Sequence, residues 1–182
     1  MIAGASHSVR PARREDVPAI AAIYGHHVTT GSATFELASP SVEEMARRLD
    51  EITDGGYPFL VVTDDAQAVV GYAYASAYRA RPAYRFTVED SVYLAPGSVG
   101  CGLGSRLLAA IIDACTSRGD RQMIAVIGGA DNAASIALHA RAGFVEAGRL
   151  AAVGRKFDRW IDTVLMQRPL GDGATSPPRP RD

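Results

Sequence analysis

The sequence has no long hydrophobic run. No apolar stretch approaches the roughly 20 residues that a helix needs to cross a bilayer. The opening segment, MIAGASHSVR, lacks the basic start and the apolar centre of a secretory signal peptide. We therefore expect a cytoplasmic protein without a membrane partner.

The sequence also lacks an excess of charge of either sign. Its 19 Lys and Arg residues against 20 Asp and Glu residues give a formal net charge of −1. The basic surface that attracts nucleic acid is therefore missing, and we expect no nucleic-acid partner.

Cysteine is scarce, with Cys101 and Cys115 as the only two. They have no spacing typical of a disulfide framework, which favours a reducing compartment. The adjacent His26 and His27 have no Cys or acidic residue at ligand spacing, so we expect no metal site.

The chain of 182 residues is long enough for one domain with a substantial core and too short for two ordinary ones. We assign residues 8–170 to a single domain. The remainder, GDGATSPPRPRD at 171–182, is rich in Gly, Pro and charge, and we expect a disordered tail there.

Hydrophobic periodicity divides the domain into strands and helices. A polar and flexible segment is expected at 25–34. The order of the elements predicts a mixed sheet with helices on both faces. We expect strands at 8–12, 59–63, 68–77, 88–94, 122–127, 144–153 and 160–168, and helices at 13–24, from Ser39 or Ser41 to Gly55, at 103–119 and at 132–142.

The stretch at 87–104, TVEDSVYLAPGSVGCGLG, combines a strand, a glycine-rich turn and the start of a helix. Glycines allow the backbone to come close to a ligand, and the unpaired N–H groups and dipole of a helix N-terminus favour an anion. The pattern indicates a phosphate or diphosphate site, with a plain strand-to-helix connection as the alternative. The helix has one apolar face, made by Leu103, Leu107, Leu108, Ile111, Ile112 and Cys115.

Two familiar phosphate-binding motifs do not fit this stretch. A P-loop ends in Gly-Lys-Ser/Thr, whereas this sequence has Gly104-Ser105-Arg106. A Rossmann turn follows an early strand and needs an acidic residue about 20 positions later, at the end of the next strand. Here the turn lies past mid-chain, and Asp120 only precedes the next strand.

The turn resembles the acyl-CoA loop of the GNAT N-acetyltransferases, Arg/Gln-x-x-Gly-x-Gly/Ala, which corresponds here to VGCGLG at 99–104. Val99 departs from that pattern, because Arg or Gln usually stands there, and we expect weaker cofactor binding as a result. The similarity extends over about residues 8 to 170 and points to the phosphinothricin and methionine sulfoximine acetyltransferase branch. Its segments are VRPARREDVPAIAAIY at 9–24, SATFE at 32–36, YRARPAYRFTVEDSVYL at 78–94, DNAASIALHARAGF at 131–144 and VGRKFDRWIDTVLMQRPL at 153–170.

This resemblance implies an α/β fold with a mixed, mostly antiparallel central sheet of about seven strands, and it implies a homodimer. It also implies an enzyme that acetylates the α-amine of a small amino-acid analogue with acetyl-CoA, by direct transfer in a ternary complex. Phosphinothricin, methionine sulfoximine and methionine sulfone are the implied substrates. Two alternatives stay open: a GNAT enzyme for another amine, and a non-catalytic acyl-CoA-binding module.

The resemblance assigns the catalytic roles to Glu89 and His139. Glu89 corresponds to the acidic residue with which this branch deprotonates its substrate, directly or through water. Asp90 points the other way by strand alternation. His139 lies in LHARAGF at 138–144, where many GNAT enzymes have the Tyr that protonates the leaving thiolate and where this branch has His. Without the resemblance, a solvent-facing carboxylate and a structural histidine would be the simpler interpretations.

The binding residues are assigned in the same way. An amino-acid carboxylate favours an arginine partner, which the basic segment YRARPAYR supplies. Contacts to acetyl-CoA are implied for Val92, Tyr93, Leu94, Val99, Gly100, Cys101, Gly102, Leu103, Gly104, Asn132 and Ser135. Contacts to the substrate are implied for Phe35, Glu36, Arg79, Arg81, Tyr84, Thr87 and Val88.

Overall fold

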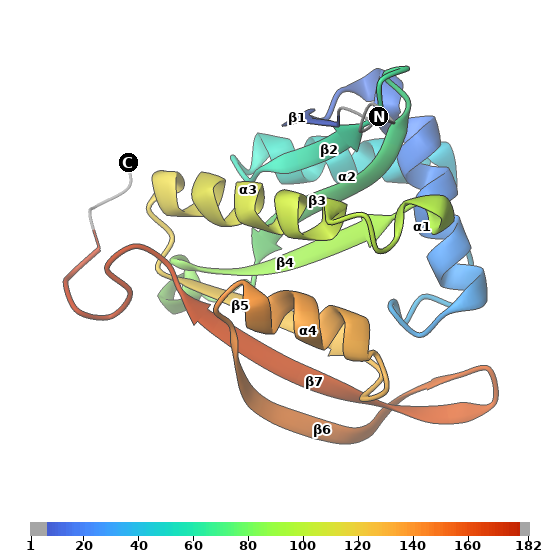
Figure 1. Cartoon of the computed structure of the whole chain (residues 1–182). Helices are drawn as coiled ribbons and strands as arrows, with labels where there is room; N and C mark the ends of the chain where they lie inside the picture. The colour runs from blue at the N-terminus through green and yellow to red at the C-terminus, as the bar shows by residue number, and fades with distance from the viewer. Residues whose placement is uncertain (1–6, 179–182) are drawn as a thin grey trace, which may run out of the picture.

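The structure, a computed structural model, describes residues 7–178. Its centre is one seven-stranded sheet in the order β1-β2-β3-β4-β5-β7-β6 (Figure 1). β4 and β5 run parallel, and the other neighbouring strands run antiparallel. The prediction of a mixed, mostly antiparallel sheet is therefore confirmed. The strands are β1 (Ser8–Pro11), β2 (Phe59–Thr63), β3 (Val69–Ala77), β4 (Thr87–Leu94), β5 (Gln122–Gly128), β6 (Val145–Lys156) and β7 (Arg159–Pro169).

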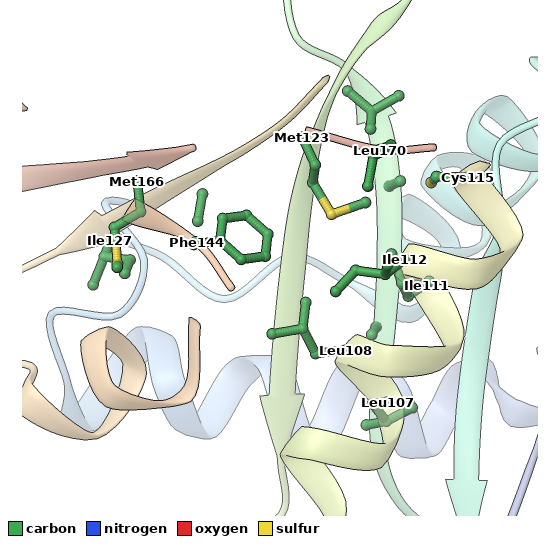
Figure 2. Packing of buried hydrophobic residues seen from close by; sticks show 14 of the residues in the cluster. Leu107, Leu108, Ile111, Ile112, Cys115, Met123, Ile127, Phe144, Met166 and Leu170 are labelled. Carbon is green, nitrogen blue, oxygen red and sulfur yellow. The ribbon is translucent and has the colours of Figure 1, made fainter. Parts of the chain in front are cut away.

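Helices cover both faces of this sheet, as expected. On one face, apolar side chains of α1 and α2 pack against Phe59, Val61 and Tyr72 of β2 and β3. On the other face, α3 packs against strand residues such as Val88 and Met123. Figure 2 shows the leucines and isoleucines of α3 next to Met123, with Phe144, Met166 and Ile127 grouped beside them. The helices are α1 (Val17–Thr30), α2 (Val42–Asp54), α3 (Leu103–Arg118) and α4 (Ala133–Arg141).

α1 is longer than the sequence predicts. The segment at 25–34 was expected to be polar and flexible, but the helix continues through Gly25 to Thr30. Val28 gives the physical reason, because its side chain is only 1% exposed and extends the buried face formed by Ile20 and Tyr24. The prediction of a flexible segment is wrong for residues 25–30.

The start of α2 and both ends of α3 agree with the sequence signals. Ser41 caps α2, since its hydroxyl oxygen accepts a hydrogen bond from the Glu44 backbone N–H at 3.2 Å. α3 begins after Gly102, whose φ is +78°, and ends at Gly119, whose φ is +86°. Both glycines hold left-handed backbone that a side chain would strain.

β4 and β5 separate half-way along their length. Their parallel pairing covers only Thr87–Asp90 against Gln122–Ala125. Beyond that point β4 pairs with β3 alone and β5 pairs with β7 alone. The two strands diverge visibly in Figure 1, with the start of α3 beside one and α4 beside the other. This divergence positions the site described next.

The last described residues lie near the start of β5. Arg121 donates hydrogen bonds to the Pro177 carbonyl and the Ser176 hydroxyl, and it forms an ion pair with Asp172. Residues 171–178, the first part of the tail at 171–182, form a turn next to Arg121. Residues 179–182 lie outside the described part. Within residues 7–178, the helices are too short or too polar to cross a membrane.

Candidate active site

A cavity of about 600 Å³ occupies the space between the diverging ends of β4 and β5. Its walls are the last residues of both strands, the glycine turn and one side of α4. It brings together most of the residues predicted to contact acetyl-CoA: Val92, Tyr93, Leu94, Val99, Gly100, Gly102, Gly104, Asn132 and Ser135. These residues come from separate parts of the sequence. They line one cavity because β4 and β5 diverge.

The β4 side of the cavity offers backbone groups to an extended ligand. From Ser91 to Leu94 the strand pairs with β3 on one edge and has no strand partner on the other within residues 7–178. A chain with amide groups can add to such an edge as an extra strand would. Pantetheine, the arm of acetyl-CoA, has two amides of this kind.

His27 occupies the end of this edge. Its Nε2 lies 2.8 Å from the Leu94 carbonyl oxygen, and because a carbonyl only accepts, the ring nitrogen donates. Burial lowers the pKa of His27, which favours the neutral ring and outweighs the opposing hydrogen bond. No sequence pattern indicated this contact, because it joins residues that are far apart in the chain.

The glycine turn leaves open space in front of the α3 N-terminus. Gly100 and Gly102 have φ values of +82° and +78°, and a Cβ at either would meet nothing within 4 Å. Glycine is therefore needed here for the backbone conformation, and the adjoining space is free for a ligand. No side chain of the described residues caps α3 at Gly102, so the first N–H groups of the helix are available to an anion.

Two residues of the predicted loop contribute less than expected. Leu103 is 1% exposed and its side chain belongs to the core, so only its backbone can face the cavity. Cys101 is exposed and is not among the residues that line the cavity.

α4 supplies the remaining wall. The Asn132 side chain accepts a hydrogen bond from the Ser135 backbone N–H at 3.2 Å and caps this helix. Arg141, which we did not predict, is the one Arg or Lys among the lining residues of the described chain. Its charge is suited to the phosphates of a nucleotide cofactor.

His139 and Asp90 form a buried pair in the cavity wall. His139 Nε2 lies 3.0 Å from Asp90 Oδ2, and Nδ1 lies 2.8 Å from the Ser135 carbonyl oxygen. The two side chains are 6% and 1% exposed. Both ring nitrogens face acceptors, which suits the doubly protonated ring. Burial alone would lower the pKa of His139, but the hydrogen bond and the charge of Asp90 outweigh it and raise the pKa above its ordinary value.

The pairing with His139 uses only one of the two Asp90 carboxylate oxygens. Its Oδ1 is buried and has no hydrogen-bond partner among residues 7–178. A buried carboxylate oxygen without a partner is costly, so a donor from a bound molecule would stabilise it. The sequence placed Asp90 on the opposite face from Glu89, which agrees with the structure, but it could not show the pairing with His139.

Glu89 lies on the α1 and α2 face of β4. It pairs in register with Ser76, and its side chain is half-buried. Burial raises the pKa of Glu89, the Arg79 charge opposes this rise, and the Asp90 charge adds to it. A carboxylate with a raised pKa beside a cavity is suited to accepting a proton. Glu89 does not itself line the cavity, whereas its neighbours Asp90 and Ser91 do.

The predicted substrate residues gather on two segments. Glu36 accepts hydrogen bonds from the Tyr24 hydroxyl at 2.9 Å and from Arg48 at 2.7 Å. Phe35, from the same loop, packs its ring against the backbone of Gly154.

This loop is held by the only lysine of the chain. The Lys156 ammonium donates to the carbonyl oxygens of Gly31 and Thr34, both at 2.9 Å. Lys156 is 3% exposed, and its burial lowers the pKa of the ammonium. The loop that carries Phe35 and Glu36 is therefore fixed to the end of β6.

The basic segment is open to solvent. Arg79 stacks its guanidinium over the Tyr78 ring at 4.3 Å, and Arg81 and Tyr84 are exposed. Thr87 is half-buried and lies on the same face of β4 as Glu89.

Val88, also a predicted substrate contact, has a buried side chain. It is 0% exposed and belongs to the core beneath α3, so only the backbone of Val88 can face a substrate. Strand alternation explains this result, because Val88 points to the face opposite Thr87 and Glu89.

Metal ligands do not cluster in the described residues. Between residues 7 and 178, no group of three or more His, Cys, Asp or Glu side chains could hold a metal ion.

Comparison with known proteins decides the family. The chain matches the acetyltransferase (GNAT) domain family over residues 9–165. It belongs to the GNAT acetyltransferases. This acetyltransferase is 53% identical to phosphinothricin N-acetyltransferase from Alcaligenes faecalis, over 94% of this chain and 86% of the relative. It is 38% identical to an L-methionine sulfoximine/L-methionine sulfone acetyltransferase from Pseudomonas aeruginosa, over 94% of this chain and 99% of the relative.

A solved structure shares the fold of this acetyltransferase closely. It is a GNAT phosphinothricin acetyltransferase from Sinorhizobium meliloti in complex with AcCoA. The TM-score is 0.93 at 50% identity, with 95% of this chain and 93% of that chain covered. The chain is thus an acyltransferase of a family that uses acetyl-CoA.

Proposed function

We propose that this acetyltransferase transfers the acetyl group of acetyl-CoA to the α-amine of a small amino-acid analogue. Phosphinothricin, methionine sulfoximine and methionine sulfone are the proposed acceptors, and the names of the relatives support this class. The observation that carries the proposal is the cavity between β4 and β5, which adjoins a half-buried carboxylate of raised pKa at Glu89.

The residues of the cavity fit acetyl-CoA, which supplies an acetyl group activated as a thioester. The free edge of β4 at Ser91–Leu94 is placed to pair with the pantetheine amides. The open turn at Gly100 and Gly102 leads to the uncapped N-terminus of α3, where the diphosphate would bind. Arg141 adds the positive charge that Val99 does not provide.

Glu89 is the proposed base. An α-ammonium group must lose a proton before the nitrogen can attack a carbonyl carbon, and general bases work best when their pKa approaches the operating pH. Burial raises the pKa of Glu89, which brings it closer to neutral pH. Arg79, close enough to act on Glu89 through its charge, is the proposed partner of the acceptor carboxylate.

His139 is the proposed acid for the departing thiolate. The ring is hydrogen-bonded to the Ser135 carbonyl through Nδ1 and to Asp90 through Nε2, and the proposed proton donor is Nε2. Asp90 holds the Nε2 proton in place by stabilising the charged ring. We propose that the two residues act as one unit.

We also propose a homodimer in the cytoplasm. β6 is an edge strand, and exposed apolar side chains lie along it and at the start of β7: Val145, Leu150, Val153 and Trp160. An exposed apolar edge of this kind favours association of two copies. The sequence has only two cysteines, Cys101 and Cys115, at no spacing typical of a disulfide framework, which suits a reducing compartment.

Thiol release from acetyl-CoA tests the function directly. The purified chain is incubated with acetyl-CoA and with phosphinothricin, methionine sulfoximine, methionine sulfone or methionine. We expect release that depends on the acceptor and yields the N-acetyl product by mass spectrometry. N-acetyl-methionine sulfone, which has no free amine, is the matched control and should give none. Release at the same rate with and without an acceptor would contradict the proposal.

A further inference from the structure

A second cavity, of about 410 Å³, lies on the face of the sheet that α1 and α2 cover. It opens between α2 and the strands β2 and β3, on the face that also carries Glu89. The walls that matter here are Tyr24, Arg48, Phe59, Tyr72, Tyr74 and Ser76. We call it the aromatic pocket.

One wall of the aromatic pocket is a cluster of three nearly parallel rings. The Phe59 centroid lies 5.6 Å from that of Tyr72 and 5.1 Å from that of Tyr74, and the two tyrosine centroids are 6.4 Å apart. Such a wall gives a flat apolar surface that suits methylene and methyl groups.

Of the two tyrosine hydroxyls in this wall, that of Tyr72 is buried and unpaired among the described residues. Tyr72 as a whole is 0% exposed. Buried hydroxyls are nearly always paired, and leaving one unpaired is costly. A ligand oxygen within the pocket would satisfy this group.

The aromatic pocket lies beside the proposed base. Ser76 pairs with Glu89 and Tyr74 pairs with Ser91 in the antiparallel register of β3 and β4. Side chains opposite each other in such a pair lie on the same face, with Cβ atoms about 5 Å apart. The aromatic pocket therefore begins at Ser76, the cross-strand neighbour of Glu89.

The charges around the aromatic pocket are balanced within the protein. Arg48 donates to Glu36 at 2.7 Å and to Glu44 at 2.8 Å, so both carboxylates share its charge. Glu51 is the other ionic side chain of the lining. The pocket thus presents no spare positive charge to an anionic ligand.

From these observations we infer that the aromatic pocket receives the side chain of the acceptor amino acid. It would select an uncharged side chain with an apolar stem and a terminal oxygen acceptor for the Tyr72 hydroxyl, which is the chemistry of a sulfone or sulfoximine. This inference rests on the proposed function, because it assumes that an amino acid is acetylated beside Glu89. The inference goes beyond the proposed function in two ways. It locates the side chain of the acceptor, and it ranks neutral acceptors above phosphinothricin, whose side chain carries an anionic phosphinate.

Tyr72→Phe tests the hydroxyl with a matched pair of substrates. The variant keeps the ring cluster and removes only the unpaired oxygen, so we expect unchanged or slightly higher thermal stability. We expect kcat/KM for methionine sulfone to fall about five- to tenfold, as for the loss of one hydrogen bond, while the value for methionine, which lacks the oxygen, stays constant. Calorimetry with CoA present should show the same loss in methionine sulfone affinity. Equal effects on both substrates, or no effect on either, would mean that the hydroxyl meets at most a water molecule and would overturn the inference.

Ser76→Leu tests the pocket by filling its entrance. We expect the rate with methionine sulfone to fall at least tenfold, while the rate with alanine, whose side chain is too short to enter, changes little. An unchanged ratio of the two rates would place the side chain elsewhere and overturn the inference. If the wild-type chain acetylates no amino acid at all, the proposed function itself fails. If it acetylates phosphinothricin at least as efficiently as methionine sulfone, only the selection of neutral side chains fails.

Discussion

Replacing Asp90 by Asn removes the charge that holds His139 protonated and leaves the shape of the site nearly intact. Removal of one partner from a buried ion pair costs about 3–5 kcal/mol when the other charge stays behind. Here the cost is smaller, because His139 can lose its Nε2 proton and the new amide can donate to that nitrogen. We therefore expect a loss of about 1–3 kcal/mol, the cost of an imperfectly replaced hydrogen bond. For a chain of this length that corresponds to a fall in Tm of roughly 2–12 °C.

The loss should depend on pH in a definite direction. The pKa of His139 in the folded protein lies above its ordinary value, which is about 6.5 in an unfolded chain. The pair therefore contributes its full stability below about pH 6.5, and the contribution is lost as the pH rises through the folded pKa. The difference in Tm between wild type and Asp90→Asn should be largest near pH 6 and should shrink in alkaline solution.

Two assays check this prediction. Thermal unfolding across the pH range gives the difference in stability, and an NMR titration of the His139 ring gives its pKa, which should be lower in the variant. Asp113→Asn, at an exposed position on α3, is the matched control and should change neither quantity. An unchanged His139 pKa in Asp90→Asn, or a Tm difference that is constant with pH, would refute the pairing as the cause of the protonated ring.

The other predictions concern the base, the cofactor and the acceptor. Glu89→Gln should lower kcat by at least about 100-fold at neutral pH with unchanged acetyl-CoA affinity in calorimetry, and an unchanged rate would remove Glu89 as the base. Gly102→Val should abolish acetyl-CoA binding while far-UV circular dichroism stays the same, since the left-handed backbone and the open space are both lost. Arg141→Ala should weaken acetyl-CoA binding and make the remaining affinity less sensitive to salt, and equal salt dependence would argue against a phosphate contact. Arg79→Ala should raise KM for amino acids but not for a simple amine without a carboxylate, and equal increases would contradict carboxylate recognition.

Local chemistry made much of the fold predictable. The alternation of apolar residues gave the strands, the Ser41 cap gave the start of α2, and the glycines at 100, 102 and 104 marked the turn before α3. Alternation along β4 also placed Glu89 and Asp90 on opposite faces correctly. These features depend on residues close together in the chain, which is why the sequence reveals them.

The site was harder to predict, because it depends on contacts between distant segments. The hydrogen bonds of His27 to Leu94 and of His139 to Asp90 each span more than 45 positions. These contacts depend on the position at which β4 and β5 separate. No pattern of neighbouring residues in the sequence indicates that position. The burial of the Val88 side chain follows from alternation along β4, whereas its assignment as a substrate contact came from the resemblance alone.

A crystal structure of the complex with CoA and methionine sulfone would show whether the acetyl group is transferred between β4 and β5 and beside Glu89. We expect the diphosphate against the backbone of the turn at 99–104 and the pantetheine arm along Ser91–Leu94. We expect the acceptor nitrogen within hydrogen-bond reach of Glu89 or of one water bound to it. Cofactor bound outside the gap between β4 and β5, or an acceptor nitrogen remote from Glu89, would contradict the proposed function.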